Sequence, residues 1–194
     1  QPFGSMFNMV LNDLGESGEK RMGKEKIGII DIGFRTSDYT ISDKMRYSER
    51  GSRTTDSGIA RAFTSIANKL REKSGVGVEL YRLYDAVDRG SIKIRGKEYD
   101  LKVLTDQVFG QLASAIANEA DRLWADDWDI DAMVITGGGG AVIARHLTPL
   151  LHGNVLPMDP NRDARLFNVQ GYWKFGKHLW ARGAISAPVK TPAV

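Results

Sequence analysis

The pattern of apolar and polar positions divides the first quarter of the chain into a helix, a loop and several strands. Segment 1–14 carries apolar residues at helical spacing, and the polar, glycine-containing stretch behind it predicts a loop. Segment 27–32 is an apolar run long enough for a buried strand. Strand character resumes at 36–41 after a tight turn, and a third strand is expected at 45–50. The pattern therefore predicts an antiparallel start to a sheet.

The rest of the chain alternates helical and strand-like segments. Segment 51–58 is polar and predicts a loop, and the apolar positions of 59–70 repeat at helical spacing. Segment 91–103 alternates between apolar and polar residues and predicts a second hairpin. Thr105 is the expected N-cap of a long amphipathic helix. The further elements expected are a helix at 80–87, a strand at 131–136, a helix at 141–151, a strand at 154–157 and a helix at 166–180.

This order of elements predicts an α/β protein with a mixed sheet covered by helices. Segments 1–57 and 104–183 are expected to form its core. Segment 58–103 is expected to form a small inserted α+β subdomain. The tail 184–194 carries two prolines and is expected to be disordered.

Composition narrows the class of protein without identifying it. The 194 residues, 42% of them apolar, suffice for one domain with a buried core. The absence of cysteine excludes disulfides and thiolate metal sites and fits a reducing cytoplasm. No apolar run approaches the roughly 20 residues that span a bilayer. A net charge of +3 would attract phosphate or nucleic acid only as a general basic surface.

The first candidate site is the turn between the first two predicted strands. Asp31 ends a buried strand, Gly33 permits a tight turn, and Thr36 and Asp38 follow on the returning strand. Backbone amides in such a turn can bind phosphate, and an adjacent carboxylate can hold Mg²⁺ through water. Arg35 at the tip would add positive charge. The alternative is a plain hairpin in which Asp31 pairs with a nearby cation.

The second candidate site is a run of four glycines, 137–140, that follows the predicted strand ending at Thr136. Glycine lets a ligand lie directly against the backbone, and a simple turn does not need four of them. The helix expected next offers unpaired N–H groups and a favourable dipole to an anion. The run matches neither a P-loop nor a dinucleotide-binding fingerprint. The alternative is a flexible turn between strand and helix.

In combination, the two motifs resemble those of the actin-like ATPase superfamily, which includes the seventy-kilodalton heat-shock chaperones and the sugar kinases. There a hairpin of this kind is the second phosphate-binding motif, and a glycine stretch after a strand, here about 100 residues later, is the adenosine-binding motif. The resemblance implies a ribonuclease-H-like fold with a five-stranded mixed sheet flanked by helices.

Two further segments resemble ParM/StbA-type plasmid-segregation proteins and archaeal actin-like proteins. The opening 1–5 is similar to the segment that links the two halves of those proteins, in which a Gln or Glu orients the attacking water. Segment 167–176 is similar to their C-terminal motif, although Phe167 replaces the usual alanine. The residues that match this motif are Asn168, Gly171, Tyr172, Lys174 and Gly176. The resemblance runs from Gln1 to about position 180 and implies the C-terminal half only, with the upstream half missing.

The resemblance implies a protein that binds and hydrolyses ATP with Mg²⁺ between two lobes. Gln1 and Asp31 would be the catalytic residues, with Asp31 holding Mg²⁺ through water. Nucleotide contacts are expected from Gly33, Phe34, Arg35, Thr36, Asp38, Thr136, Gly137, Gly138 and Gly139. The isolated half is expected to be inactive, because catalysis by positioning and electrostatics needs both sides of the cleft.

Polymerisation into filaments, in plasmid segregation or as a cytoskeleton, is implied for the full-length protein in the cytoplasm. An adaptor protein is a further partner, and nucleic acid contact is expected to be indirect at most. Two other classes stay open: a monomeric phosphotransferase or activator ATPase of the same superfamily, and a non-catalytic interaction module on the same fold.

Several other residues have both a functional and a structural interpretation. Asp56 or Ser57 would contact the ribose or base, or else cap the following helix. The three histidines are too dispersed for a metal site. Four tryptophans are expected in the core or at interfaces: Trp124, Trp128, Trp173 and Trp180. Four acidic residues are expected in a solvated loop: Asp126, Asp127, Asp129 and Asp131.

Overall fold

The chain is described by a computed structural model that covers residues 2–18, 22–157 and 162–184. A five-stranded sheet in the order β3-β2-β1-β6-β7 forms its centre. β1 pairs antiparallel with β2 and parallel with β6, β2 pairs antiparallel with β3, and β6 pairs parallel with β7. The predicted α/β fold with a mixed five-stranded sheet is confirmed. The strands are β1 (Lys26–Ile32), β2 (Ser37–Asp43), β3 (Arg46–Thr55), β6 (Ala132–Thr136) and β7 (Val155–Leu156).

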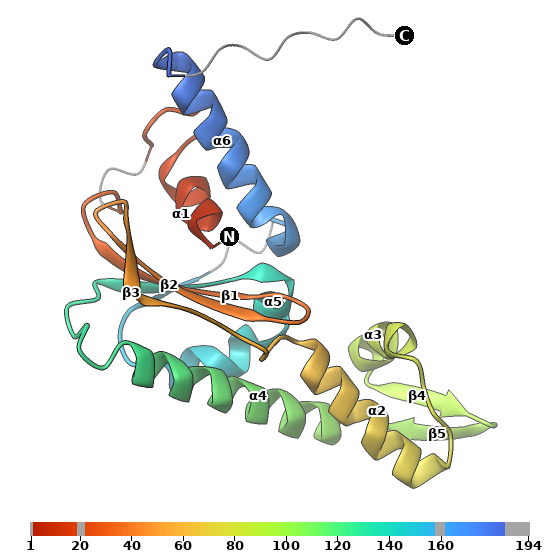
Figure 1. Ribbon diagram of the computed structural model, residues 1–194. Helices are drawn as coiled ribbons and strands as arrows, with labels where there is room; N and C mark the ends of the chain where they lie inside the picture. The colour runs from red at the N-terminus through yellow and green to blue at the C-terminus, as the bar shows by residue number, and fades with distance from the viewer. Residues whose placement is uncertain (1, 19–21, 158–161, 185–194) are drawn as a thin grey trace, which may run out of the picture.

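Helices cover both faces of the sheet (Figure 1). On one face, α1 (Phe3–Val10) and α6 (Phe167–Ala181) lie side by side. The other face packs against α4 (Lys102–Leu123) and α5 (Gly137–Leu147). Short 3-10 turns, η1 (Thr148–Leu150) and η2 (Ala164–Leu166), precede β7 and α6.

The period-two alternation of β1 decides which side chains meet which layer. Ile27 and Ile29 are buried with Met6 and Val10 of α1, whereas Ile30 belongs to the cluster that includes the apolar side of α4. Successive strand residues point to opposite faces. By the same alternation Asp31 faces the α1 and α6 layer, which matters for the site described below.

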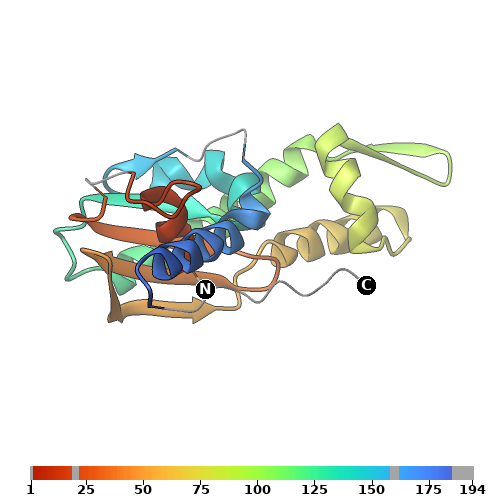
Figure 2. The same cartoon turned by 90° about the horizontal axis from the view of Figure 1, so that it is seen from above.

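The segment between β3 and α4 extends away from the sheet, as both views show (Figure 2). It contains α2 (Ala60–Ser74), α3 (Leu80–Arg89) and a hairpin of β4 (Ser91–Ile94) and β5 (Lys97–Asp100). The apolar side chains of α2 and α3 nevertheless join the same buried cluster as α4. The hairpin turns at Arg95 and Gly96, both with positive φ.

Several element boundaries differ from the sequence prediction. β3 continues through the predicted loop to Thr55. α4 begins at Lys102, so Thr105 is a buried residue of the helix rather than its N-cap. α5 begins at Gly137 and ends at Leu147, earlier at both ends than predicted. Gly137, with φ +83, makes the turn from β6 into this helix by itself. The other three glycines of the run therefore belong to the first turn of a helix.

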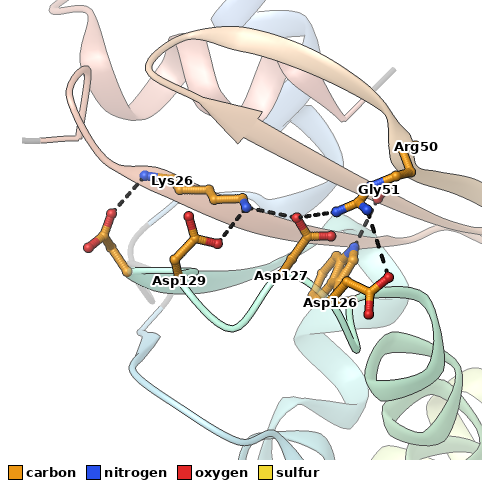
Figure 3. Close-up of polar contacts among 8 residues, drawn as sticks. Lys26, Arg50, Gly51, Asp126, Asp127 and Asp129 are labelled. Carbon is orange, nitrogen blue, oxygen red and sulfur yellow. Dashed lines mark hydrogen bonds and ion pairs between the residues drawn. The ribbon is translucent and has the colours of Figure 1, made fainter.

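The acidic loop differs from expectation, and the tryptophans divide into two groups. Trp124 is a core residue, whereas Trp128, Trp173 and Trp180 are exposed, which leaves an interface as the predicted role for these three. Asp127 is buried at 7% exposure, which contradicts a simple solvated loop. Its Oδ1 lies 2.7 Å from Nζ of Lys26 and 3.3 Å from Nη2 of Arg50 (Figure 3).

This acidic loop, which leads into β6, ties the start of β1 to β3 at one end of the sheet. Lys26 also reaches Asp129 at 2.6 Å, and its backbone amide donates to the carboxylate of Asp131. The indole N–H of Trp124 donates to the carbonyl of Gly51 in β3 at 2.9 Å. Lys26 begins β1 and Asp31 lies near its other end, so this network serves the structure rather than the candidate site.

Candidate functional site

The pairing of β1 with β6 brings the two sequence motifs together. Asp31 is directly opposite Thr136 in the parallel register, so both strands end at the same edge of the sheet. The turn after β1 and the glycine run after β6 therefore face a common space. In α/β sheets, ligands bind preferentially at the carboxyl ends of parallel strands.

A cavity of about 960 Å³ opens at this edge. It is bounded by the ends of β1 and β6, by α5, by the start of α6 and by helices α2, α3 and α4. Six predicted site residues line it: Asp31, Gly33, Phe34, Gly137, Gly138 and Gly139.

The first turn of α5 approaches the end of β1 so closely that side chains are excluded. A Cβ added to Gly139 would lie 2.8 Å from Cγ2 of Ile32 and 2.9 Å from its carbonyl oxygen. A Cβ added to Gly137 would meet Oδ1 of Asp31. The first amides of a helix have no intrahelical partner, and the dipole favours an anion there. The glycines leave this end of α5 bare of side chains beside a carboxylate.

Asp31 is buried at 6% exposure and is held by a side chain from the opposite end of the chain. Nδ2 of Asn168 donates a hydrogen bond to Oδ2 of Asp31. Burial raises the pKa of Asp31 above its usual range, the hydrogen bond from Asn168 opposes that rise, and the charge of Asp38 adds to it. Asp38 is opposite Asp31 in the antiparallel register of β1 and β2. A carboxylate buried in this way is favoured in its charged form by a cation beside it.

The turn between β1 and β2 is closed by a hydrogen bond of 2.9 Å from the amide of Gly33 to the carbonyl of Thr36. Phe34 is half-exposed, and it lines the cavity beside Gly33. Arg35 and Thr36 lie in the turn but do not line the cavity.

The remaining predicted site residues lie in three different situations. Asp38 is outside the lining, and its carboxylate accepts a hydrogen bond from Thr54. Thr136 is fully buried behind the cavity, with its Oγ1 3.1 Å from Oγ of Ser5. Gln1 lies outside the described residues.

Several lining residues were not predicted from the sequence. Arg165 lies over the start of α5, since a Cβ added to Gly138 would be 3.0 Å from its Cγ. The aromatic wall comes from Phe63, Tyr84 and Phe109, and the rings of Phe63 and Tyr84 meet edge to face with centroids 4.8 Å apart. Because they are spread over three helices, only their apolar helical spacing is visible in the sequence, and that spacing indicates core.

The loop before α2 does not use its polar side chains as a helix cap. α2 has no side-chain capping hydrogen bond, and Ser57 pairs instead with Thr55. The capping interpretation of Asp56 and Ser57 is therefore wrong. Asp56 and Ser57 line a separate surface pocket with Arg53 and Arg61.

The arrangement suits a phosphate-bearing ligand better than a metal held by protein alone. Among the described residues, no cluster of three or more His, Asp or Glu is placed to hold a metal ion. A single carboxylate beside a helix N-terminus fits a cation that keeps most of its water and shares phosphate oxygens, as Mg²⁺ prefers. The aromatic wall provides apolar surface of the kind that lines ligand sites.

Comparison with solved structures defines the class of protein. A ParM described as a pCBH ParM non-polymerisable quadruple mutant matches with a TM-score of 0.74 and 27% identity over 90% of this chain and 52% of that one. A ParM from a 15-stranded filament of Clostridium botulinum matches with a TM-score of 0.72 and 26% identity over 90% of this chain and 51% of that one. The archaeal actin homologue Ta0583 in complex with ADP shares the fold, with a TM-score of 0.74 and 17% identity over 91% of this chain and 56% of that one. The chain thus has an actin-like fold and spans about half the length of the proteins it resembles.

The family model for the C-terminal part of the archaeal MreB-like actin homologues matches residues 29–148. This region is more than half of the chain and includes both motifs, so the chain belongs to that family. A search of curated proteins gives no significant match. None of the helices in the described ranges is both long and apolar enough to pass through a membrane.

Proposed function

We propose that this chain is the nucleotide-binding C-terminal lobe of a two-lobed actin-like ATPase that binds and hydrolyses Mg-ATP and polymerises. The observation that carries the proposal is the shared cavity in which buried Asp31 and the glycine-rich start of α5 face each other. The actin-like fold and the family membership support it.

Different residues of the chain contact the phosphates, the metal and the nucleobase of the ligand in this proposal. The amides at the start of α5 donate to phosphate oxygens, and the absence of side chains at Gly137 to Gly139 allows close approach. The turn after β1 offers the backbone amide of Phe34, which lines the same cavity, to these phosphates. Asp31 orients the water shell of Mg²⁺, which supplies charge neutralisation of the phosphates when bound. The nucleobase lies against the aromatic wall formed by Phe63, Tyr84 and Phe109.

Hydrolysis and assembly belong to the whole protein in this proposal. Phosphoryl transfer depends on positioning and electrostatic stabilisation from both sides of the ligand. The chain spans about half of its structural relatives, so the opposing lobe supplies the rest of the clamp. Gln1 orients the attacking water in this proposal, as its resemblance to the linking segment of actin-like proteins implies. A relative in this class has been seen with ADP and another as a filament, which supports nucleotide binding and self-association here.

The test is phosphate release by the two-lobed protein with Mg-ATP, for the unaltered form and for Asp31→Ala. We expect the substitution to lower kcat by at least about a hundredfold, the scale on which removing one electrostatic contact acts. Asp43→Ala is the matched control, because Asp43 is an exposed acid at the opposite end of β2 and should leave the rate unchanged. Equal background rates in all three proteins would eliminate the ATPase and favour a non-catalytic interaction module.

Sedimentation with and without ATP separates filament formation from the alternatives. A polymerising ATPase pellets when nucleotide is added. A monomeric phosphotransferase stays in the supernatant and transfers phosphate only when an acceptor is present.

A further inference from the structure

A network of hydrogen-bonding side chains leads from Asp31 to Thr136 on the α1 and α6 side of the sheet. Asn168 donates through Nδ2 to Asp31, and its Oδ1 accepts from the backbone amide of Ser5 and from the Ser5 hydroxyl, each at 2.9 Å. Oγ of Ser5 lies 3.1 Å from Oγ1 of Thr136. Thr136 is the register partner of Asp31, so the two ends of the network lie on adjacent strands.

The network fixes the orientation of the Asn168 side chain. A backbone N–H can only donate, so the group of Asn168 that faces Ser5 must be its carbonyl oxygen. The amide nitrogen therefore has to face Asp31. Ser5 and Thr136 are fully buried and Asp31 nearly so, whereas Asn168 is half-buried at the edge of the cavity.

Close approach of α1 and α6 makes the network possible. Gly4 of α1 and Gly171 of α6 face each other, and a Cβ on Gly171 would overlap the carbonyl oxygen of Gly4. A Cβ on Gly4 would lie 2.5 Å from the carbonyl oxygen of Asn168. Because both residues are glycine, the backbones come close enough for the short side chain of Ser5 to reach Asn168.

One oxygen of Asp31 is thereby held and the other is left for a ligand. Oδ2 accepts from Asn168, whereas Oδ1 lies beside the backbone of Gly137 at the start of α5. Asp31 and Asn168 both line the cavity, and Ser5 supports them from behind.

We propose that Asn168 and Ser5 are positioning residues that hold the Asp31 carboxylate so that its free oxygen faces the metal-bound phosphates. This inference rests on the proposed function, because it assigns a role to a carboxylate that we place beside Mg²⁺. It goes beyond that function because it assigns the orientation of the Asp31 carboxylate to residues of α1 and α6. Residues behind metal-binding groups typically change metal affinity by about 10–100-fold when removed.

The test measures the affinity of the two-lobed protein with ADP for Mn²⁺, which substitutes for Mg²⁺ and is detected by electron paramagnetic resonance. Asn168→Ala should weaken the apparent affinity for Mn²⁺ by about tenfold or more. Asn168→Leu, which keeps a similar size and loses both the donor and the acceptor, should weaken it by a similar factor. Ser5→Ala removes the hydroxyl bond to Asn168 but keeps the backbone amide bond, so it should have a smaller effect in the same direction. ADP binding without metal should stay within about twofold in all variants.

Asn8→Ala is the matched control. Asn8 is another asparagine between α1 and α6, fully buried where Asn168 is half-buried, and its Nδ2 donates to the carbonyl of Phe167 at 3.1 Å, but it makes no contact with Asp31. It should lower the thermal stability as Asn168→Ala does and leave the Mn²⁺ affinity unchanged.

The outcomes distinguish this inference from the function on which it rests. Unaltered protein that fails to bind Mn²⁺ with ADP would overturn both. Mn²⁺ binding that is unchanged in Asn168→Ala, or equally weakened in Asn8→Ala, would overturn the positioning role alone and leave the proposed nucleotide site standing.

Discussion

The backbone amide of Gly58 donates a hydrogen bond of 3.0 Å to the carbonyl oxygen of Arg35, which ties the loop before α2 to the turn after β1. The next two amides, of Ile59 and Ala60, donate to the carbonyls of Gly33 and Phe34 at 3.1 and 2.9 Å. The turn thus takes the place of a capping side chain at the start of α2. A displacement of this turn by bound phosphate would therefore be transmitted directly to α2.

Replacing Gly58 with alanine should break this connection. The new Cβ would lie within about 2.6 Å of backbone atoms of Phe34 and Arg35, which cannot move independently of the sheet. We expect a loss of about 1–3 kcal/mol in the free energy of unfolding, measured by denaturant titration of the chain. Gly77→Ala is the control, since that loop glycine has nothing within 4 Å of its added Cβ. A stable Gly58→Ala protein would show that the turn and α2 are not rigidly joined.

Replacing Gly139 with alanine should separate α5 from β1. Its Cβ would press on Ile32 and on the carbonyl of Gly33, 3.0 Å away, so we expect both lower stability and nucleotide affinity weakened by about tenfold, equivalent to about 1.4 kcal/mol. Titration with a fluorescent nucleotide measures the affinity.

Gly110→Ala provides the contrast for that experiment. Gly110 also lies in a helix, α4, and its added Cβ meets nothing within 4 Å. Alanine there should stabilise the chain by up to about 1 kcal/mol through helix propensity and leave nucleotide affinity unchanged. Equal nucleotide affinities for the two variants would argue against a ligand at the start of α5.

Asp31→Asn should stabilise the nucleotide-free chain at pH 7 while removing Mg²⁺-dependent nucleotide binding. The pKa of Asp31 is raised by burial, so the folded state binds its proton more tightly than the unfolded state does. The contribution of Asp31 to stability is therefore greatest at acid pH. It falls as the pH rises from the ordinary value of 3.8 through the raised folded-state pKa, above which the buried charge destabilises the fold.

Thermal unfolding at several pH values measures this effect. The gain in Tm from Asp31→Asn should be present at pH 7 and diminish as the pH is lowered toward 3.8. The asparagine oxygen can still accept from Asn168, so the comparison isolates the charge. A variant that is less stable than the unaltered chain at pH 7 would mean that Asp31 has a stabilising cationic partner.

Lys26→Met should destabilise the sheet at the end opposite the site. The substitution removes the ammonium group that lies 2.7 Å from the buried carboxylate of Asp127 and leaves Arg50 as its neighbouring cation (Figure 3). We expect a loss of about 1–3 kcal/mol, the cost of leaving a buried charged group without its partner. Chemical denaturation measures it.

Asp126→Asn serves as the control for the acidic loop. Its side chain is 85% exposed and lies 3.7 Å from Arg50, so the substitution should change stability by less than about 1 kcal/mol. Nucleotide binding should be unaffected by either change, because the network lies at the N-terminal end of β1. An effect of Lys26→Met on nucleotide affinity would contradict that separation.

The elements of the sheet could be predicted because their signals are local. The apolar run before Asp31 and the one before Thr136 each identify a buried strand, and the glycines beside each mark the place where the chain turns. The boundaries were less accurate where two outcomes are locally equivalent. Gly137 to Gly140 permit a loop as well as a helical turn, and only packing of α5 against Ile32 selects the helix.

The sequence alone determined the alternation that turns Asp31 away from the α4 side of the sheet, together with the pair of motifs that indicates a nucleotide. It did not determine that Asn168 would hold Asp31, that Ser5 would hold Asn168, or that aromatic residues from three helices would wall the cavity. Those contacts join positions far apart in the chain, and they depend on how closely α1 approaches α6. That distance is decided by the packing of the two helices. The role of Gly4 and Gly171, which permit the close approach, can be recognised only when the helices lie face to face.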